Sequence, residues 1–150
     1  MPCYANSCYS SNFTYDKKKM ADIPHMIQLA VSHLKNAHAP YSKFHVSCCI
    51  QGINQRYYVG VNVENIVYPL GNCAEASAIS QMVTDGCKGI DSVVLLTSEN
   101  RLCSPCGGCR QRLYEFATPS TKIYLCNQKS VLKEYNLTDL LPEAFHLLPT

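Results

Sequence analysis

Three cysteines and one glutamate stand in two short motifs that are suited to metal chemistry. Cys73-Ala74-Glu75 forms the first motif, and Cys106 and Cys109 belong to a Pro-Cys-Gly-Gly-Cys segment that forms the second. Three thiolates leave the fourth position of a tetrahedral zinc shell open, which is typical of a catalytic zinc that binds water. A carboxylate two residues from a ligand is placed to move protons. These residue types predict a catalytic zinc site.

Each motif is predicted to lie at the start of a helix. Apolar residues recur at helical spacing from about Asn72 to Asp85, and Ser104 and Pro105 are typical helix-opening residues before the second motif. The positive end of a helix and its unpaired N–H groups favour thiolates over thiols. We therefore expect two helix N-termini to converge at the metal.

Each motif alone also has a simpler interpretation. A single C-x-x-C segment is common in structural zinc sites and in redox pairs. Glu75 follows Asn72 by three residues, which is the spacing of a helix capping box. The combination favours catalysis, because C-A-E at one helix start and P-C-x-x-C at another match the zinc deaminase pattern, with Cys73 where other members use histidine.

The rest of the sequence predicts a layered α/β domain around these two helices. The further expected elements are a helix from Asp22 to Pro40, a hairpin of strands at 44–50 and 57–63, strands at 93–97 and 123–126, and a short helix at 137–141. Helices that alternate with a sheet beginning as a hairpin imply an α/β fold with a mixed sheet.

The composition fits one domain that acts on a small molecule. The chain has 150 residues, of which 47% are hydrophobic and 16% charged, and its formal net charge is +2. This near balance disfavours a nucleic acid polymer as partner. The sequence has neither an apolar run long enough for a membrane span nor an apolar secretory stretch at its N-terminus. We expect a cytoplasmic protein without a membrane partner.

Ten cysteines without an export signal favour reduced thiols or a metal site over disulfides. Three of them fall in strand-like stretches and are interpreted as small buried hydrophobic residues: Cys48, Cys49 and Cys126. Residues 1–19 are polar and are predicted to form a disordered leader, and its Cys3 and Cys8 are given no zinc role.

From about Pro24 to Phe145, the sequence resembles the small homotetrameric cytidine deaminases. Besides the zinc motifs, the similarity is carried by segments 39–44, 61–65, 68–71, 109–111 and 140–145. The resemblance implies a three-layer α/β domain over residues 20–150, with a mixed sheet of about five strands between helices. It also implies Zn²⁺ as the cofactor and a hydrolase of pyrimidine salvage, which deaminates cytidine and 2′-deoxycytidine to uridine and 2′-deoxyuridine.

The resemblance implies a role for each residue of the two zinc motifs. Zinc held by Cys73, Cys106 and Cys109 would lower the pKa of its bound water. Glu75 would take that proton and pass protons to N3 of the cytosine ring and to the departing amine.

Six residues are expected to bind the nucleoside: Phe44, Asn62, Glu64, Tyr68, Ala74 and Phe145. In the family, the positions of Asn62 and Glu64 bind the ribose 3′-hydroxyl, Phe44 resembles the residue that packs on the base, and Phe145 resembles one that reaches a neighbouring subunit's base. Strand alternation places Asn62 and Glu64 on one face. Simpler interpretations stay open: a solvated strand end for this pair, a core aromatic for Phe44, and packing of the last helix for Phe145.

Three other functions stay open at this stage. They are a deaminase of the same fold that acts on a blasticidin-type nucleoside or a polynucleotide, a non-catalytic zinc-stabilised interaction module, and a weak or inactive paralogue. The near-neutral charge disfavours polynucleotides, and segments 62–65 and 68–71 resemble the nucleoside-salvage version. Glu75 disfavours the interaction module.

Ala76 is the clearest departure from the family. Three thiolates on Zn²⁺ leave a net negative charge, which opposes ionisation of the bound water. Members with three cysteines usually have arginine at this position to offset that charge. We expect either another donor, with the helix amides and Arg110 or Gln111 as candidates, or a slower enzyme.

Overall fold

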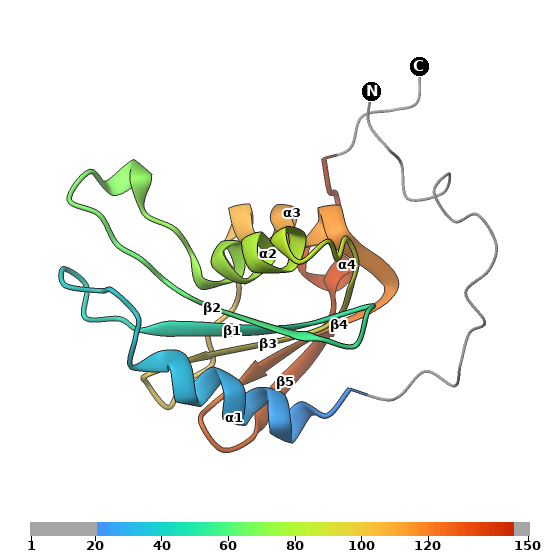
Figure 1. The fold of residues 1–150 in the computed structure, drawn as a ribbon, viewed down its shortest axis with the longest axis horizontal. Coiled ribbons are helices and arrows are strands. Elements are labelled where there is room, and N and C mark those ends of the chain that lie inside the picture. The colour runs from blue at the N-terminus through green and yellow to red at the C-terminus, as the bar shows by residue number, and fades with distance from the viewer. Residues whose placement is uncertain (1–20, 146–150) are drawn as a thin grey trace.

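A mixed sheet of five strands forms the middle layer of the domain (Figure 1). The computed structural model describes residues 21–145, and the predicted leader lies outside them. The strands are β1 (Val46–Gly52), β2 (Tyr57–Val61), β3 (Ile90–Thr97), β4 (Ala117–Cys126) and β5 (Val131–Asn136), in the order β2-β1-β3-β4-β5. β3 and β4 are parallel, and the other neighbours are antiparallel. The predicted mixed sheet is confirmed.

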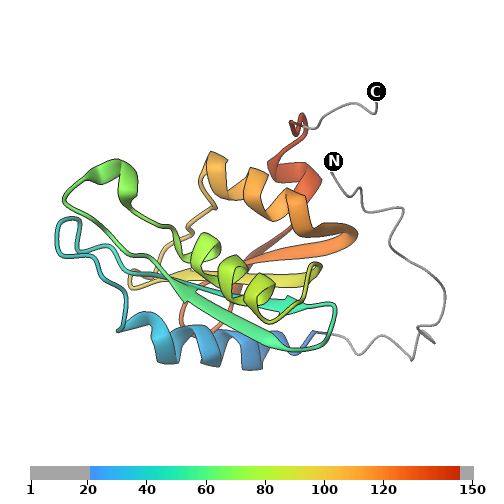
Figure 2. The same ribbon diagram turned by 45° about the horizontal axis from the view of Figure 1, so that its top comes forward.

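Helices cover both faces of this sheet (Figures 1 and 2). One face is covered by α1 (Ile23–Leu34), and the other by α2 (Ala74–Thr84), α3 (Gly107–Phe116) and α4 (Leu137–Leu140). A 3₁₀ turn at Tyr68–Leu70 lies in the connection from β2 to α2. Among the residues that the structure describes, no helix combines the length and the apolar character of a membrane span.

The buried cysteines of the sheet are explained by these two helical layers. β1 is buried on both faces, so that Cys48 packs in the core beneath α2 and α3 while its neighbour Cys49 packs in the core beneath α1. Cys126 belongs to the second core. The interpretation of these three thiols as buried hydrophobic residues is confirmed.

Several elements differ from the predicted boundaries. α1 begins as predicted, with the Asp22 carboxylate accepting from the His25 amide, but it ends at Leu34 instead of continuing to Pro40. The chain turns earlier because His38 pairs with the residues just after β2, where its amide donates to the Asn62 carbonyl. α3 begins at Gly107, later than Ser104 and Pro105 suggested.

β5 was not predicted, although it completes the sheet. Its six residues are mostly exposed, so they lack the apolar alternation by which sequence reasoning recognises a strand. β5 pairs with β4 from Lys122 and Asn136 to Cys126 and Val131, and it forms an edge of the sheet.

Close packing of α2 on β2 fixes the first zinc motif. A Cβ atom added at Gly60 would lie 2.3 Å from both the Ala74 carbonyl oxygen and the Ala78 amide nitrogen. Only glycine allows this approach of strand and helix. At the other end, Gly86 follows α2 with a φ of 82°, as expected for a residue that ends a helix.

Candidate metal centre and active site

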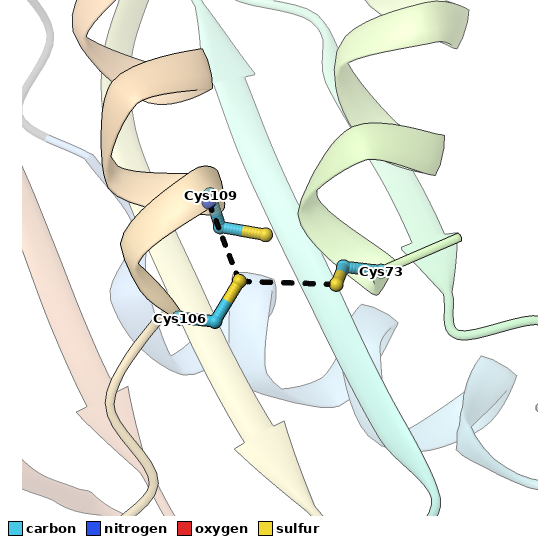
Figure 3. Close-up of side chains that lie close together, drawn as sticks. All are labelled: Cys73, Cys106 and Cys109. Carbon is cyan, nitrogen blue, oxygen red and sulfur yellow. Dashed lines mark hydrogen bonds between the residues drawn. The ribbon is translucent and has the colours of Figure 1, made fainter. Parts of the chain in front are cut away.

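Three thiols converge from the starts of α2 and α3, as Figure 3 shows. The Sγ atoms of Cys73 and Cys106 lie 4.0 Å apart, and those of Cys73, Cys106 and Cys109 all lie within 4.8 Å of one another. Tetrahedral zinc with Zn–S bonds of about 2.3 Å needs sulfurs about 3.8 Å apart. The donor set and its spacing therefore fit zinc. No other cluster of three potential ligands occurs in residues 21–145.

Helix geometry provides hydrogen bonds to these sulfurs. Cys106 is the N-cap of α3, and its Sγ accepts from the Cys109 amide at 3.4 Å. Cys73 is the N-cap of α2. Hydrogen bonding from Cys109 lowers the pKa of the Cys73 thiol to about 6, and the same bond raises the pKa of the donor, Cys109. The convergence of two helix N-termini is confirmed.

Glu75 lies in the first turn of α2 and is only 4% exposed. Burial raises the pKa of its carboxyl group, which prepares it to hold a proton. The capping-box interpretation is wrong, because Cys73 and not Asn72 is the N-cap, and the side-chain nitrogen of Asn72 instead donates to the Ser77 hydroxyl at 3.1 Å. A hydrogen bond from Cys109 opposes the rise caused by burial and lowers the pKa of Glu75, which places this carboxyl group beside the cluster.

Asn62 and Glu64 are not a solvated strand end. The Asn62 side chain accepts from the Val46 amide at 2.8 Å and donates to the Phe44 carbonyl at 2.9 Å. The Glu64 carboxylate accepts from the amides of Tyr41 and Ser42, at 2.9 and 3.2 Å, and from the Ser42 hydroxyl. The Ser42 hydroxyl is the main cause that lowers the pKa of Glu64. Both side chains hold the segment that precedes β1.

Three other residues that were expected to bind the nucleoside differ in how far they are exposed. Phe44 is half-buried, and the guanidinium carbon of Arg101 lies 5.2 Å from the centre of its ring. Tyr68 is 77% exposed and meets Tyr41 edge to face, with ring centres 6.3 Å apart. Ala74 is fully buried.

Phe145 is 72% exposed, which excludes its interpretation as packing of the last helix. Its backbone is fixed by Gln111, whose side chain accepts from the Phe145 amide at 3.0 Å and donates to the Phe145 carbonyl at 2.8 Å. In Figures 1 and 2, the green 3₁₀ turn and the described chain end after α4 lie apart from each other, both on the side of the sheet that α2 and α3 cover.

Of the predicted substitutes for an arginine at position 76, a helix amide does serve a sulfur, since the Cys109 amide donates to the Cys106 Sγ, whereas Arg110 and Gln111 are engaged elsewhere. Arg110 donates to the carbonyls of Pro105 and Leu140, at 2.9 Å each, and to the Ser104 hydroxyl. Gln111 is bonded to the backbone of Phe145. Sequence reasoning missed Arg112, whose charge does act on the site. Its spacing of three residues from Cys109 on one helix face is the signal that points to it.

A buried carboxylate beside three convergent thiols at two helix starts defines a zinc centre of the deaminase class. Residues 20–125 match the model of the cytidine and deoxycytidylate deaminase zinc-binding region, and the chain belongs to this family. The resemblance that the sequence motifs indicated is confirmed.

Similar proteins agree with this assignment. The cytidine deaminase of Mycoplasma genitalium is 42% identical over 113 residues, which are 75% of this chain and 86% of that protein. The cytidine deaminase of Sporosarcina psychrophila is 35% identical over 124 residues, or 83% and 91% of the two chains. The crystal structure of cytidine deaminase from Burkholderia pseudomallei superposes with a TM-score of 0.75 at 31% identity, covering 81% of this chain and 97% of that one. The expected fold is confirmed.

Proposed function

We propose that the chain is a zinc-dependent cytidine deaminase. Water is added at C4 of cytidine or 2′-deoxycytidine, the C4–N4 bond breaks, and uridine or 2′-deoxyuridine and ammonia are released. The single observation that carries this proposal is the buried carboxylate of Glu75 beside the three convergent cysteines. A structural zinc site has no use for a carboxylate kept from solvent at such a position.

Each residue of the site has a task in this reaction. Cys73, Cys106 and Cys109 hold Zn²⁺, a Lewis acid that lowers the pKa of water when bound. Glu75 accepts the proton that water releases, and its raised pKa, caused by burial, lets the carboxyl group keep the proton until N3 or the leaving amine takes it.

In this proposal, Asn62 and Glu64 have two roles. They hold the loop that forms the nucleoside pocket, and they also bind the substrate. An ionised carboxylate offers about four acceptor positions. Glu64 uses three of them for Tyr41 and Ser42, which leaves one for a ribose hydroxyl. Asn62 holds the carbonyl of Phe44, so that the ring of Phe44 is placed to pack on the base.

The site is proposed to be shared between subunits of a homotetramer. A run of apolar side chains in and just before the 3₁₀ turn is exposed, at Ile66, Val67, Tyr68 and Leu70. Contiguous apolar surface of this kind marks interaction sites, and a second copy of the chain is the proposed occupant. The turn and the described chain end after α4 lie apart in one domain (Figures 1 and 2), so the proposal gives the contacts at these two places to different subunits.

A role in pyrimidine salvage in the cytoplasm completes the proposal, because the substrate is a free nucleoside. The cysteines among the described residues are all free thiols, which is typical of a reducing compartment.

Loss of cytidine absorbance after addition of the purified, zinc-loaded protein tests the function. We expect stoichiometric release of ammonia and uridine, slowed by about 10²-fold or more with Glu75→Gln. Blasticidin S and a single-stranded oligodeoxycytidine are assayed in parallel. Consumption of one of these with cytidine untouched would replace the proposal with a related deaminase. If folded, zinc-loaded protein consumes none of these substrates, the result would favour a non-catalytic module or an inactive paralogue.

A further inference from the structure

The backbone of Phe44 is held from two directions, so that mainly its ring is left to be oriented. The Phe44 amide donates to the Ser42 hydroxyl at 3.0 Å, and the Phe44 carbonyl accepts from the Asn62 side chain at 2.9 Å. The ring is half-buried, and rotation about its side-chain bonds decides which way it faces. A group that contacts the ring can therefore select one orientation.

The loop that follows β3 runs beside this residue and is itself fixed. The Ser98 amide donates to the carbonyl of His45, the neighbour of Phe44, at 3.0 Å. The hydroxyl of Thr97, which is fully buried, accepts from the Glu99 amide at 3.3 Å and donates to the Glu99 carbonyl at 3.1 Å. These bonds set the position of the loop relative to the segment before β1.

Arg101 extends from this loop over the ring of Phe44. Its guanidinium carbon lies 5.2 Å from the ring centre, and its Nε atom is paired with the Glu99 carboxylate. A cation within about 6 Å of a ring centre is attracted to the face of the ring. Since a guanidinium is planar, it can stack on a ring while its N–H groups bond a carboxylate. Glu99 therefore anchors the guanidinium against one face of Phe44.

We propose that Arg101 positions Phe44 for the pyrimidine base. The guanidinium occupies one face of the ring and leaves the other face for the flat base, which aromatic rings bind by offset stacking. Arg101 acts through Phe44 and not on the reacting atoms, so it is a positioning residue. This inference rests on the proposed function, in which Phe44 packs on the base, and it adds a residue that belongs to neither zinc motif.

Fluorine NMR tests the contact without substrate. The chain has four phenylalanines, so protein grown with 4-fluorophenylalanine gives four signals, of which Phe44→Leu identifies the one from Phe44. We expect Arg101→Met, which keeps much of the length but not the charge, to shift this signal. Arg101→Lys should keep it closer to its original position. Glu99→Gln, which weakens the anchor, should shift it in the same direction as Arg101→Met but by less.

Kinetics test the role in binding. Arg101→Met should raise KM for cytidine by about 2- to 5-fold, because the contact of an exposed cation with a ring is weak. The value of kcat should change little, since the stacking of Phe44 on the base is expected to be equal in the ground state and the transition state. Arg101→Lys should restore most of the affinity, because an ammonium group is also attracted to the face of a ring.

Lys133→Met is the matched control. The Nζ atom of Lys133 lies 4.7 Å from the ring centre of Tyr135 on β5, an edge strand that β3 and β4 separate from β1. This variant removes the same charge and the same kind of contact, and it should leave both the Phe44 signal and KM unchanged.

Three results would overturn the proposal. The Phe44 signal stays in place in Arg101→Met, or Lys133→Met moves it equally, or it moves while an active enzyme keeps its KM for cytidine. If the wild type consumes no cytidine, the proposed function fails and the role of Arg101 toward a base fails with it. The fluorine signals distinguish that case from a ring that Arg101 never held.

Discussion

Glu75 combines a charge with burial, and the two properties together define its chemistry. A carboxyl group in contact with solvent loses its proton near pH 4, whereas burial raises the pKa of Glu75. A group that both accepts and returns a proton during one turnover works best when its pKa lies close to the working pH. The position of Glu75 in the first turn of α2, one residue after a fully buried alanine, therefore matters as much as its residue type.

Substitution of Glu75 by glutamine should separate metal binding from turnover. Glutamine keeps the shape of the side chain but takes no proton, so kcat is expected to fall by about 10²- to 10⁴-fold. Bound zinc, measured by mass spectrometry of the native protein, should stay at the wild-type level. Glu115→Gln, an exposed change at the other end of α3, serves as the control with full activity. Near-normal turnover of Glu75→Gln would contradict the proposed mechanism.

Glu64 should affect substrate binding more than metal binding. Glu64→Ala removes three hydrogen bonds to Tyr41 and Ser42 together with the position proposed for a ribose hydroxyl. Hydrogen bonds to a charged group are worth about 1.5–3 kcal/mol, so KM for cytidine should rise by about 10- to 100-fold. Zinc content should not change. Unchanged kinetics would show that neither the nucleoside nor the loop depends on this carboxylate.

Among single residues, sequence alone predicted those of the metal site, because cysteines are uncommon and their spacing on a helix fixes which face they share. Thiols three residues apart on one helix must share a face, so Cys106 and Cys109 were found without a structure. The hydrogen bonds of Asn62 were not predictable, because its partners lie 16 and 18 residues away in the chain. Arg112 was missed because a charged residue on a helix is usually a solvated one.

Among the contacts between helices and strands, the metal site depends most on the packing of α2 against β2. Gly60 lets the helix backbone approach the strand, and Cys73 directly precedes that helix. Without this approach, the first sulfur would move away from the two on α3.

Gly60→Ala should therefore destabilise the fold and weaken metal binding. The added methyl group meets backbone atoms at 2.3 Å, which no side-chain movement can relieve. Overpacking of this kind costs about 1–3 kcal/mol or more, measurable as a lower urea midpoint. Gly107→Ala is the comparison, because a Cβ at that residue meets nothing within 4 Å. Equal midpoints for the two variants would argue against the close approach.

The helices and inner strands were predictable because their apolar residues repeat with a clear period. The ends were less predictable, since tertiary contacts decide them. α1 stops early because His38 pairs with Asn62, and the start of α3 shifts because the Cys106 sulfur accepts the Cys109 amide as a cap. Both partners come from the folded arrangement and leave little trace in local sequence.

For the whole molecule, an active site shared between subunits predicts that two inactive variants can restore activity when they assemble together. Glu75→Gln and Phe145→Ala impair different halves of one site if Phe145 reaches a neighbour. Co-expression should then restore activity above the sum of the separate variants, because about a quarter of the sites in mixed oligomers receive both intact residues. Glu75→Gln with Cys106→Ser should show no rescue, because both residues come from one subunit. An active monomer in sedimentation experiments would refute sharing.

The position of the three sulfurs has a consequence for folding as well as for chemistry. Cys73 and Cys106 are 33 residues apart, so a metal between them is a removable cross-link that closes a long loop of the unfolded chain. A covalent link across a loop of this length is worth about 3–4 kcal/mol of chain entropy. Removal of zinc by a chelator should lower the melting temperature by roughly 10 °C, and zinc but not magnesium should restore it. Identical melting curves with and without metal would contradict this. If zinc does cross-link the two helices, the concentration of free zinc determines how long the folded enzyme survives heating, even when no substrate is present.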